Sequence, residues 1–129
     1  MVTEKNAGNE EELHSLLMME GDLEAGELDI PADWLEALAR QGLACYVEPG
    51  IWIAAEHEDE YIRALQQQDE EAAMHIVRRM LYYRGGQTAV DVRERYFLSE
   101  EMTEALLDKL CRSKKAVEDQ GVYYHEKAL

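Results

Sequence analysis

Basic side chains near the C-terminus are the residues of this sequence best suited to a chemical task. We expect them at the end of a helix and at the base of a hairpin, where ammonium and guanidinium groups could contact phosphates. The candidates are Lys109, Arg112, Lys114 and Lys115, with Tyr123 or Tyr124 on the hairpin. A second group is Arg78, Arg79 and Arg84. The alternative is a solvated charged surface, or ion pairs with acidic residues of the same chain.

Other reactive residue types lack the spacing that chemistry requires. The histidines show no metal-ligand spacing, which favours surface or core roles; they are His14, His57, His75 and His125. Cys45 and Cys111 lie in apolar stretches without a CxxC pair, which indicates reduced thiols of a cytosolic protein. Glu58-Asp59-Glu60 indicates a solvated helix face, since no nucleophile or cofactor loop accompanies these carboxylates. We therefore predict no catalytic residue, metal site or cofactor in this chain.

Charge restricts where a polyanion could bind. The chain has 28 acidic and 13 basic residues, a net charge of −15, whereas a free DNA-binding protein should be basic. Residues 1–68 contain 16 acidic and three basic residues, and residues 69–129 contain 12 and ten. Any contact with nucleic acid therefore belongs to the second half. The first half would repel a polyanion or face a basic neighbour.

The first half predicts two helices and a hairpin. Apolar spacing indicates a helix over residues 10–19, ended by Gly21, with Leu23–Leu28 adding one or two helical turns. Asp29-Ile30-Pro31 is a helix-start signal, with a capping carboxylate and a proline in the first turn. The helix buries Trp34, Leu35 and Leu38 and ends at Gly42. The hairpin pairs residues 44–47 with 51–54 around Glu48-Pro49-Gly50, and Trp52 is expected to anchor it.

The second half predicts three helices and a second hairpin after a charged helix over residues 56–68. Residues 69–84 form the strongest helix, with His75, Arg78, Arg79 and Tyr82 on its polar face. Thr88 with Asp91 indicates a capping box for the next helix, and Ser99 caps the one after it. The outward face of this last helix carries Glu101, Glu104 and Asp108, which would repel phosphates and disfavour sequence-specific reading. Two strands follow, at residues 116–118 and 122–125.

The halves also resemble one another. Leu38 and Ala44 match Leu110 and Ala116 at an offset of 72 residues. Helices followed by a hairpin, occurring twice, indicate tandem winged-helix-like modules in a mainly α fold with small β-hairpins, an α+β protein. We expect a disordered N-terminus over residues 1–9 and a degenerate winged-helix-like module over 10–57. A connector helix over 58–68 and a winged-helix module over 69–129 complete the organisation.

One segment resembles a known family. Ile51–Glu56 reads IWIAAE and is followed by Arg63, Ala64 and Leu65. This is similar to a segment downstream of the motor domains in large helicase-related (Lhr-type) ATP-dependent DNA helicases of superfamily 2. In that family a winged helix follows, and Thr88-Ala89 lies in the matching part of the second half. The likeness covers residues 20–126, of which IWIAAE is the specific part.

The resemblance implies an accessory region of a cytoplasmic helicase that acts in DNA repair. It would brace the motor domains in cis and contact single- or double-stranded DNA weakly, without sequence specificity. The chain has neither a GxxxxGK[ST] phosphate loop nor a DExH box, so ATP and Mg would belong to the parent protein. The main alternative is an adaptor whose acidic first half docks a basic protein partner. A small transcription regulator is a weaker alternative, and an enzyme in its own right the weakest.

Overall fold

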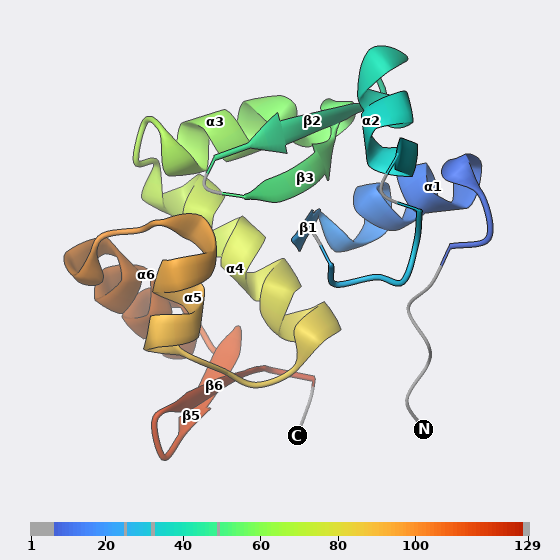
Figure 1. Ribbon diagram of the computed structural model, residues 1–129. Helices are drawn as coiled ribbons and strands as arrows, with labels where there is room; N and C mark the ends of the chain where they lie inside the picture. Colours follow the sequence, from blue (N-terminus) through green and yellow to red (C-terminus); the bar gives the residue numbers. More distant parts are fainter. Residues whose placement is uncertain (1–6, 25, 32, 49, 128–129) are drawn as a thin grey trace. The chain divides into compact units, whose positions relative to one another are not determined.

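A computed structural model describes residues 7–127 except residues 25, 32 and 49. The chain divides into an N-terminal unit, Met1–Glu58, and a C-terminal unit, Asp59–Leu129. The described residues form six α-helices and two three-stranded antiparallel sheets, so the expected α+β class is confirmed (Figure 1). Of the N-terminus expected to be disordered, residues 1–6 lie outside the described part. Ala7 is buried, and Asn9 caps the first helix.

The N-terminal unit builds a sheet against two helices. Helix α1 (Glu10–Glu20) begins where the Asn9 side chain accepts a hydrogen bond from the Glu12 backbone N–H. Strand β1 (Asp22–Glu24) follows, then α2 (Asp33–Arg40), β2 (Ala44–Val47), β3 (Ile51–Ala54) and the 3₁₀ turn η1 (Ala55–His57). The strand order is β1-β3-β2, with Cys45 opposite Ile53 in the predicted hairpin. Pro49, in the expected turn, lies outside the described residues.

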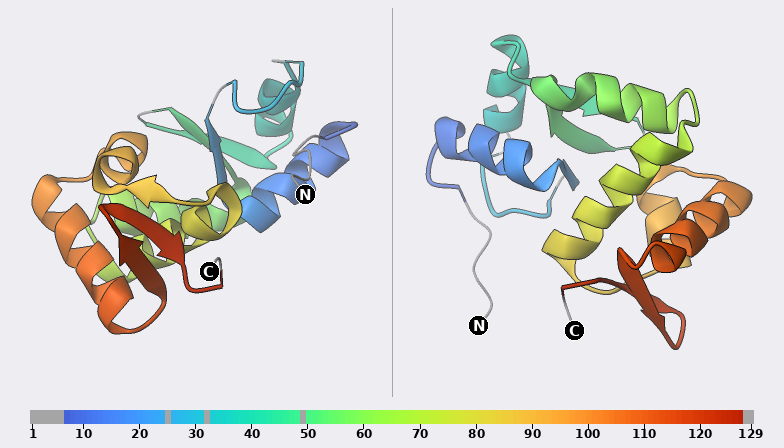
Figure 2. Two further views of the ribbon diagram at one scale, coloured as in Figure 1. Left: turned by 90° about the horizontal axis from the view of Figure 1, so that it is seen from below. Right: turned by 180° about the vertical axis from the view of Figure 1, so that it is seen from behind.

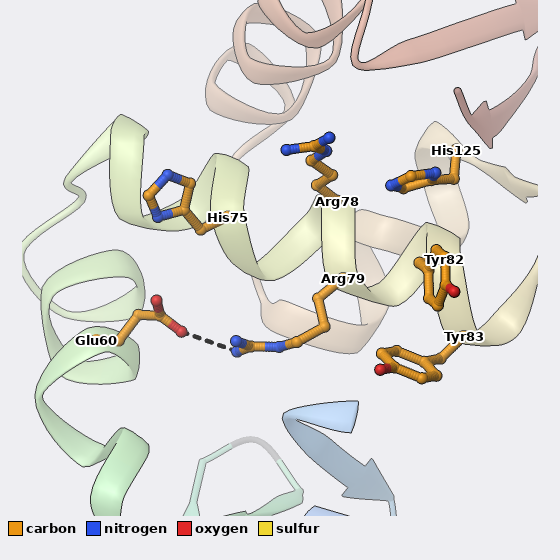
Figure 3. A pocket seen from close by; sticks show the side chains of 7 residues that line it. All are labelled: Glu60, His75, Arg78, Arg79, Tyr82, Tyr83 and His125. Carbon is orange, nitrogen blue, oxygen red and sulfur yellow. Dashed lines mark hydrogen bonds and ion pairs between the residues drawn. The ribbon is translucent and has the colours of Figure 1, made fainter. Parts of the chain in front are cut away.

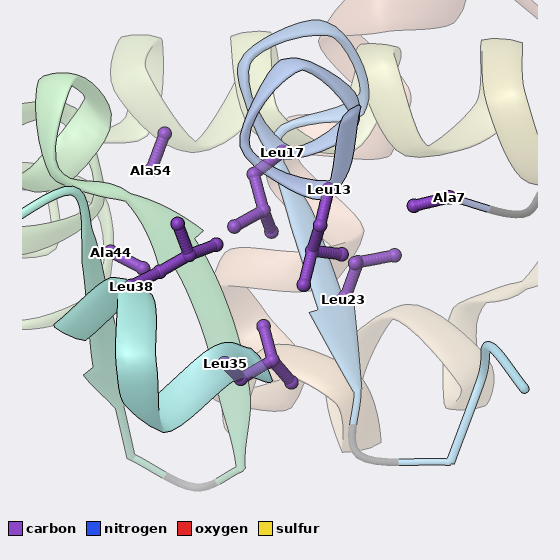
Figure 4. Packing of buried hydrophobic residues seen from close by; sticks show 8 residues of the cluster. All are labelled: Ala7, Leu13, Leu17, Leu23, Leu35, Leu38, Ala44 and Ala54. Carbon is purple, nitrogen blue, oxygen red and sulfur yellow. The ribbon is translucent and has the colours of Figure 1, made fainter. Parts of the chain in front are cut away.

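The core of this unit fills the space between α1, α2 and the sheet (Figure 4). Leu13 and Leu17 come from α1, Leu35 and Leu38 from α2, and Leu23 from β1. All five are at most 9% exposed, so the unit has an apolar core of its own. Burying a side chain of this size stabilises a fold by about 1.5–3 kcal/mol. Burial of these leucines is therefore the main contribution that holds the elements of this unit together.

Two expectations for the first half are wrong. Leu23 lies in a strand, because its backbone pairs with Trp52 of β3 and this pairing replaces the expected helical turn. Helix α2 begins at Asp33, so Asp29 and Pro31 precede its first turn. The Trp34 N–H donates to the Pro31 carbonyl at 3.1 Å, which makes Pro31 part of the turn before the helix.

The C-terminal unit contains the predicted helices and hairpin. Helix α3 (Glu58–Leu65) is shorter than expected, and α4 (Glu70–Arg84) is capped by Asp69. Strand β4 (Gln87–Thr88) leads into α5 (Ala89–Tyr96), where the capping box between Thr88 and Asp91 is present. Helix α6 (Glu100–Arg112) begins at its cap, Ser99, and the strands β5 (Ala116–Asp119) and β6 (Val122–His125) complete the unit.

The second sheet has the order β4-β6-β5, and the turn of its β5–β6 hairpin projects beyond α6 (Figure 2). The short strand β4 was not predicted. The chain just before β4 packs closely on β6. A Cβ at Gly86 would lie 2.5 Å from a Tyr124 ring carbon and 2.8 Å from a Val122 methyl. A larger residue just before β4 would therefore require the Tyr124 and Val122 side chains to move. The buried faces of α4, α5 and α6 supply the core of this unit, including Ile76, Val77, Leu81, Val92, Tyr96, Leu106 and Leu110.

The two units repeat one connection. In each, a buried leucine accepts a 2.9 Å backbone hydrogen bond from the residue five positions on: Leu43 to Leu38, and Lys115 to Leu110. The residue just before each donor has a left-handed backbone, Gly42 with φ 74° and Lys114 with φ 62°. The positions are 72 apart, the offset that the sequence predicted. The sheet orders β1-β3-β2 and β4-β6-β5 correspond as well.

Candidate functional site

The predicted basic cluster, Lys109, Arg112, Lys114 and Lys115, lies at the end of α6 and just beyond it. Within the described residues, two of its four cations have a carboxylate partner. Lys109 forms an ion pair with Glu70 of α4, and Arg112 Nη2 lies 2.9 Å from Asp108 Oδ2 one turn earlier. A phosphate that approached these two cations would compete with their carboxylate partners.

Lys114 and Lys115 have no carboxylate partner among the described residues. Lys114 is exposed and precedes β5, and Lys115 is half-buried. The Lys115 backbone N–H donates to Leu110, and its carbonyl accepts from the Glu126 N–H at 3.3 Å, so the chain here is fixed. These two residues are the part of the basic cluster that remains available to an anion.

The surroundings of the cluster are acidic. Glu101, Glu104 and Asp108 are all exposed on α6, as the sequence predicted. Tyr123 of β6 is half-buried and lies opposite Glu118 on β5. Burial, and then the nearby Cys111 and carboxylates, raise the pKa of Tyr123, so its hydroxyl remains protonated. The outer face of α6 is therefore unsuited to reading DNA.

The other arginine group meets a pocket on the polar face of α4 (Figure 3). The pocket has a volume of about 350 Å³. Its lining residues are Glu60, His75, Arg78, Arg79, Tyr82, Tyr83 and His125. Arg84, the third arginine predicted with this group, is half-buried and does not line the pocket. The structure thus brings Arg78 and Arg79 together and leaves Arg84 apart.

Both arginines of the α4 pocket are held by carboxylates. Arg79 Nη2 donates to Glu60 Oε1 at 2.8 Å and to the Tyr61 hydroxyl at 3.1 Å. Burial acts to lower the pKa of Arg79, but Tyr61 and Glu60 outweigh it and hold that pKa above its ordinary value. Arg78 donates to Glu126. The Nε atoms of Arg78 and Arg79 are buried and have no hydrogen-bond partner among the described residues, so neither guanidinium is fully satisfied there.

Aromatic rings form the other side of this pocket. Tyr82 is 55% exposed and meets Tyr83 and His125 edge to face, at centroid distances of 4.8 and 5.0 Å. His125 is 6% exposed, and its Nδ1 accepts the Lys127 backbone N–H at 3.1 Å. Burial, with Arg78 nearby, lowers the pKa of His125, which keeps its imidazole neutral.

Chemically, the α4 pocket presents guanidinium donors beside exposed aromatic surface. Such a combination suits a planar group that carries a negative charge, provided the ligand displaces a carboxylate from Arg78 or Arg79. The helical spacing of the sequence predicted that His75, Arg78, Arg79 and Tyr82 share one face. It did not predict Glu60 or His125, because other elements bring these two residues to the pocket and no local pattern indicates them.

Cys45 lies outside both regions, whereas Cys111 lies within the basic cluster and lines a pocket with Lys114. Cys45 and Cys111 are free and half-buried, and burial raises the pKa of each, with carboxylates such as Glu58 beside Cys45 adding to the effect. Raised pKa values favour the protonated thiol, which is a poor nucleophile. In the described part of the chain, no group of three or more His, Cys, Asp or Glu side chains could hold a metal ion. Nor is any described helix long and apolar enough to cross a membrane.

Comparison with known proteins adds no assignment. No family model, no curated protein and no solved structure was found to match this chain.

Proposed function

We propose that this chain is a non-catalytic accessory region of an Lhr-like ATP-dependent DNA helicase, which braces the motor and contacts nucleic acid weakly, without sequence specificity. The observation that carries the proposal is the element order of the C-terminal unit, α4-β4-α5-α6-β5-β6, with the sheet order β4-β6-β5. Three helices followed by an extended hairpin is the order of a winged helix. The corresponding connection in the N-terminal unit favours a tandem arrangement.

The IWIAAE segment, which carries the family likeness, has a structural role in this chain. Ile51, Ile53 and Ala54 are fully buried, and Trp52 packs against the core with Tyr46 edge-on at 5.3 Å. These residues hold β3 at the centre of the first sheet. Their positions are those of core residues that hold the sheet together, which is compatible with a scaffold rather than a catalytic module.

Weak contact without sequence reading follows from the charges. The carboxylates on α6 oppose insertion of this helix into a DNA groove. Lys114 and Lys115, by contrast, face no carboxylate partner among the described residues. Lys114 also has a left-handed backbone, which costs a non-glycine residue about 1 kcal/mol. Gln68, Phe97 and Gln120 have the same left-handed backbone, so it is the exposed, unpaired charge of Lys114 among the described residues that supports a role in anion contact.

Fluorescence anisotropy with labelled single- and double-stranded DNA tests the proposal. We expect weak binding to both, with little sequence preference and a steep dependence on salt. Lys114→Gln with Lys115→Gln should weaken binding and reduce the slope of log K against log salt by about 1.4 on single strands. The matched control, Lys109→Gln with Arg112→Gln, removes two charges that are already paired and should have the smaller effect. Equal effects would contradict the role given to Lys114 and Lys115.

A chain without affinity for DNA at low salt would favour the second candidate, an acidic adaptor. One observation supports that candidate. Among the described residues of the N-terminal unit, Arg40 is the one lysine or arginine, beside 13 aspartates and glutamates. The coding sequence upstream of this chain tests the helicase proposal directly. The proposal requires a motor domain with a phosphate loop there, in the same reading frame.

A further inference from the structure

An apolar groove lies on the N-terminal unit, between α2 and the first sheet. Its volume is about 350 Å³, within the range of pockets that hold a ligand or an anchoring side chain. Its apolar wall is contributed by four different segments: Leu23 from β1, Leu28 and Ile30 from the β1–α2 loop, Leu35 from α2, and Trp52 from β3.

The floor of the groove belongs to the core, whereas its sides face solvent. Leu23 and Leu35 are buried, and Figure 4 shows both within the packed cluster. Leu28, Ile30 and Trp52 are only half-buried and pack against that cluster from outside. Half-exposed apolar side chains around a concave, buried floor form the kind of surface that accepts an apolar side chain from a partner.

The rim of the groove is acidic. Glu24 and Glu36 line it directly, and both are exposed. Glu27, Asp29 and Asp33 are exposed neighbours in sequence of the lining residues. The Glu24 backbone N–H donates to Glu27 Oε1 at 2.7 Å, which joins two of the acidic residues beside the groove. The field over the groove is therefore negative.

We propose that this groove binds a cationic amphipathic segment of a partner protein, with an apolar side chain in the groove and lysines or arginines along the rim. Charge complementarity selects this occupant. Nucleic acid and acidic peptides are repelled, and a second copy would bring an equally acidic N-terminal unit to the surface. An amphipathic helix in an apolar groove is a common mode of peptide recognition. The inference does not depend on the helicase proposal.

The test uses the full chain, labelled with ¹⁵N, and a defined synthetic probe. The probe is an amphipathic helix of leucine and lysine, about 15 residues long so that it can form a helix. One control peptide has glutamate in place of lysine, and another has serine in place of leucine. We expect the cationic amphipathic peptide alone to bind. Its resonance shifts should concentrate on the Trp52 indole N–H and on the amides of residues 23, 28, 30 and 35.

Variants separate the groove from general attraction to an acidic protein. Leu28→Ser should weaken binding about ten-fold through loss of anchor contacts. Glu24→Gln with Glu36→Gln should weaken it about five-fold at low salt. The matched control, Glu11→Gln with Glu48→Gln, removes the same amount of charge outside the groove. It should change binding less than two-fold, because dissolved salt screens charges that lie far from the bound peptide. The charge variants alter exposed side chains, so they remain informative if Leu28→Ser does not fold.

Several results would overturn the proposal. These are absence of binding by the cationic amphipathic peptide at low salt, equal binding by the serine control peptide, and shifts spread over the acidic surface away from Trp52. Equal weakening by the two charge variants would show non-specific attraction instead. Concentration-dependent dimerisation abolished by Leu28→Ser, without peptide binding, would assign the groove to a second copy of the chain.

Discussion

Replacing Glu60 by glutamine probes the interaction that ties α3 to α4. Glu60 and Arg79 are 24% and 20% exposed, and the carboxylate oxygen lies 2.8 Å from the guanidinium. The Tyr61 hydroxyl, on a fully buried ring, accepts a second bond from the same nitrogen at 3.1 Å. The guanidinium of Arg79 is therefore held in one place, and the Glu60 carboxylate compensates its positive charge.

The expected loss follows from this burial. A hydrogen bond between charged groups contributes about 1.5–3 kcal/mol, and one between neutral groups about 1 kcal/mol. Glutamine keeps an acceptor but removes the charge, and leaves a mostly buried cation. We expect Glu60→Gln to lower the free energy of unfolding by about 1–2 kcal/mol. For a unit of this size, the loss corresponds to roughly 5–10 °C in Tm.

A neighbouring residue supplies the control. Asp59→Asn removes the same charge from the same helix, but Asp59 is 86% exposed and its pair with Arg63 is solvated, at 3.2 Å. Exposed pairs of this kind contribute less than about 0.5 kcal/mol. Both tryptophans, Trp34 and Trp52, lie in the N-terminal unit, so neither is a direct probe of the unit that contains this pair. Urea denaturation followed by far-UV circular dichroism, together with hydrogen exchange of α4 amides, provides the measurement.

A double-mutant cycle with Arg79→Met isolates the pair. We expect a coupling energy between Glu60 and Arg79 of about 1 kcal/mol, because the two side chains are in direct contact and largely screened from water. The reasoning is refuted if Glu60→Gln and Asp59→Asn cost the same, or if the coupling is indistinguishable from zero. Either result would mean that solvent screens the α3–α4 pair as fully as it screens the exposed one.

Three further predictions concern backbone conformation and pH. Lys114→Gly should raise the free energy of unfolding by up to about 1 kcal/mol in urea denaturation, because it relieves a left-handed lysine, while Gly42→Ala should lower it. Gly86→Ala should lower it by about 1–3 kcal/mol, because the new methyl group would overlap the Tyr124 ring. Burial holds the pKa of His125 below its ordinary 6.5, so the unfolded chain takes up a proton first as pH falls. Stability should therefore drop below about pH 6.5, until the folded-state pKa is passed, and His125→Gln should remove that part of the pH dependence.

Local sequence signals predicted the elements that depend on local interactions. The caps at Thr88 and Ser99 and the hairpin of residues 44–54 are present because their hydrogen bonds join residues close in sequence. The short strands β1 and β4 were missed. Each is only two or three residues long and exists because a distant strand, β3 or β6, pairs with it.

The candidate sites were harder to predict for the same reason. A helical repeat placed Arg78 and Arg79 on one face of α4, but their partners Glu126 and Glu60 come from outside that helix. Likewise, the sequence placed Lys109 in a basic cluster without indicating that Glu70 would neutralise it. Sequence spacing thus finds which charges share a face, and only tertiary structure shows which of them remain unpaired.

The corresponding connections in the two units bear on how their roles could differ. After Leu38 and after Leu110, the backbone makes the same left-handed turn, which glycine adopts without strain and lysine does not. The N-terminal unit has glycine there, an acidic surface and an apolar groove. The C-terminal unit has lysine there, and among the described residues Lys114 and Lys115 have no carboxylate partner. If Lys114→Gly stabilises the fold and also weakens DNA binding, the strain is retained for function. If it stabilises the fold and leaves DNA binding unchanged, Lys114 has no role in contacting nucleic acid, and the proposal loses its main basis for such contact.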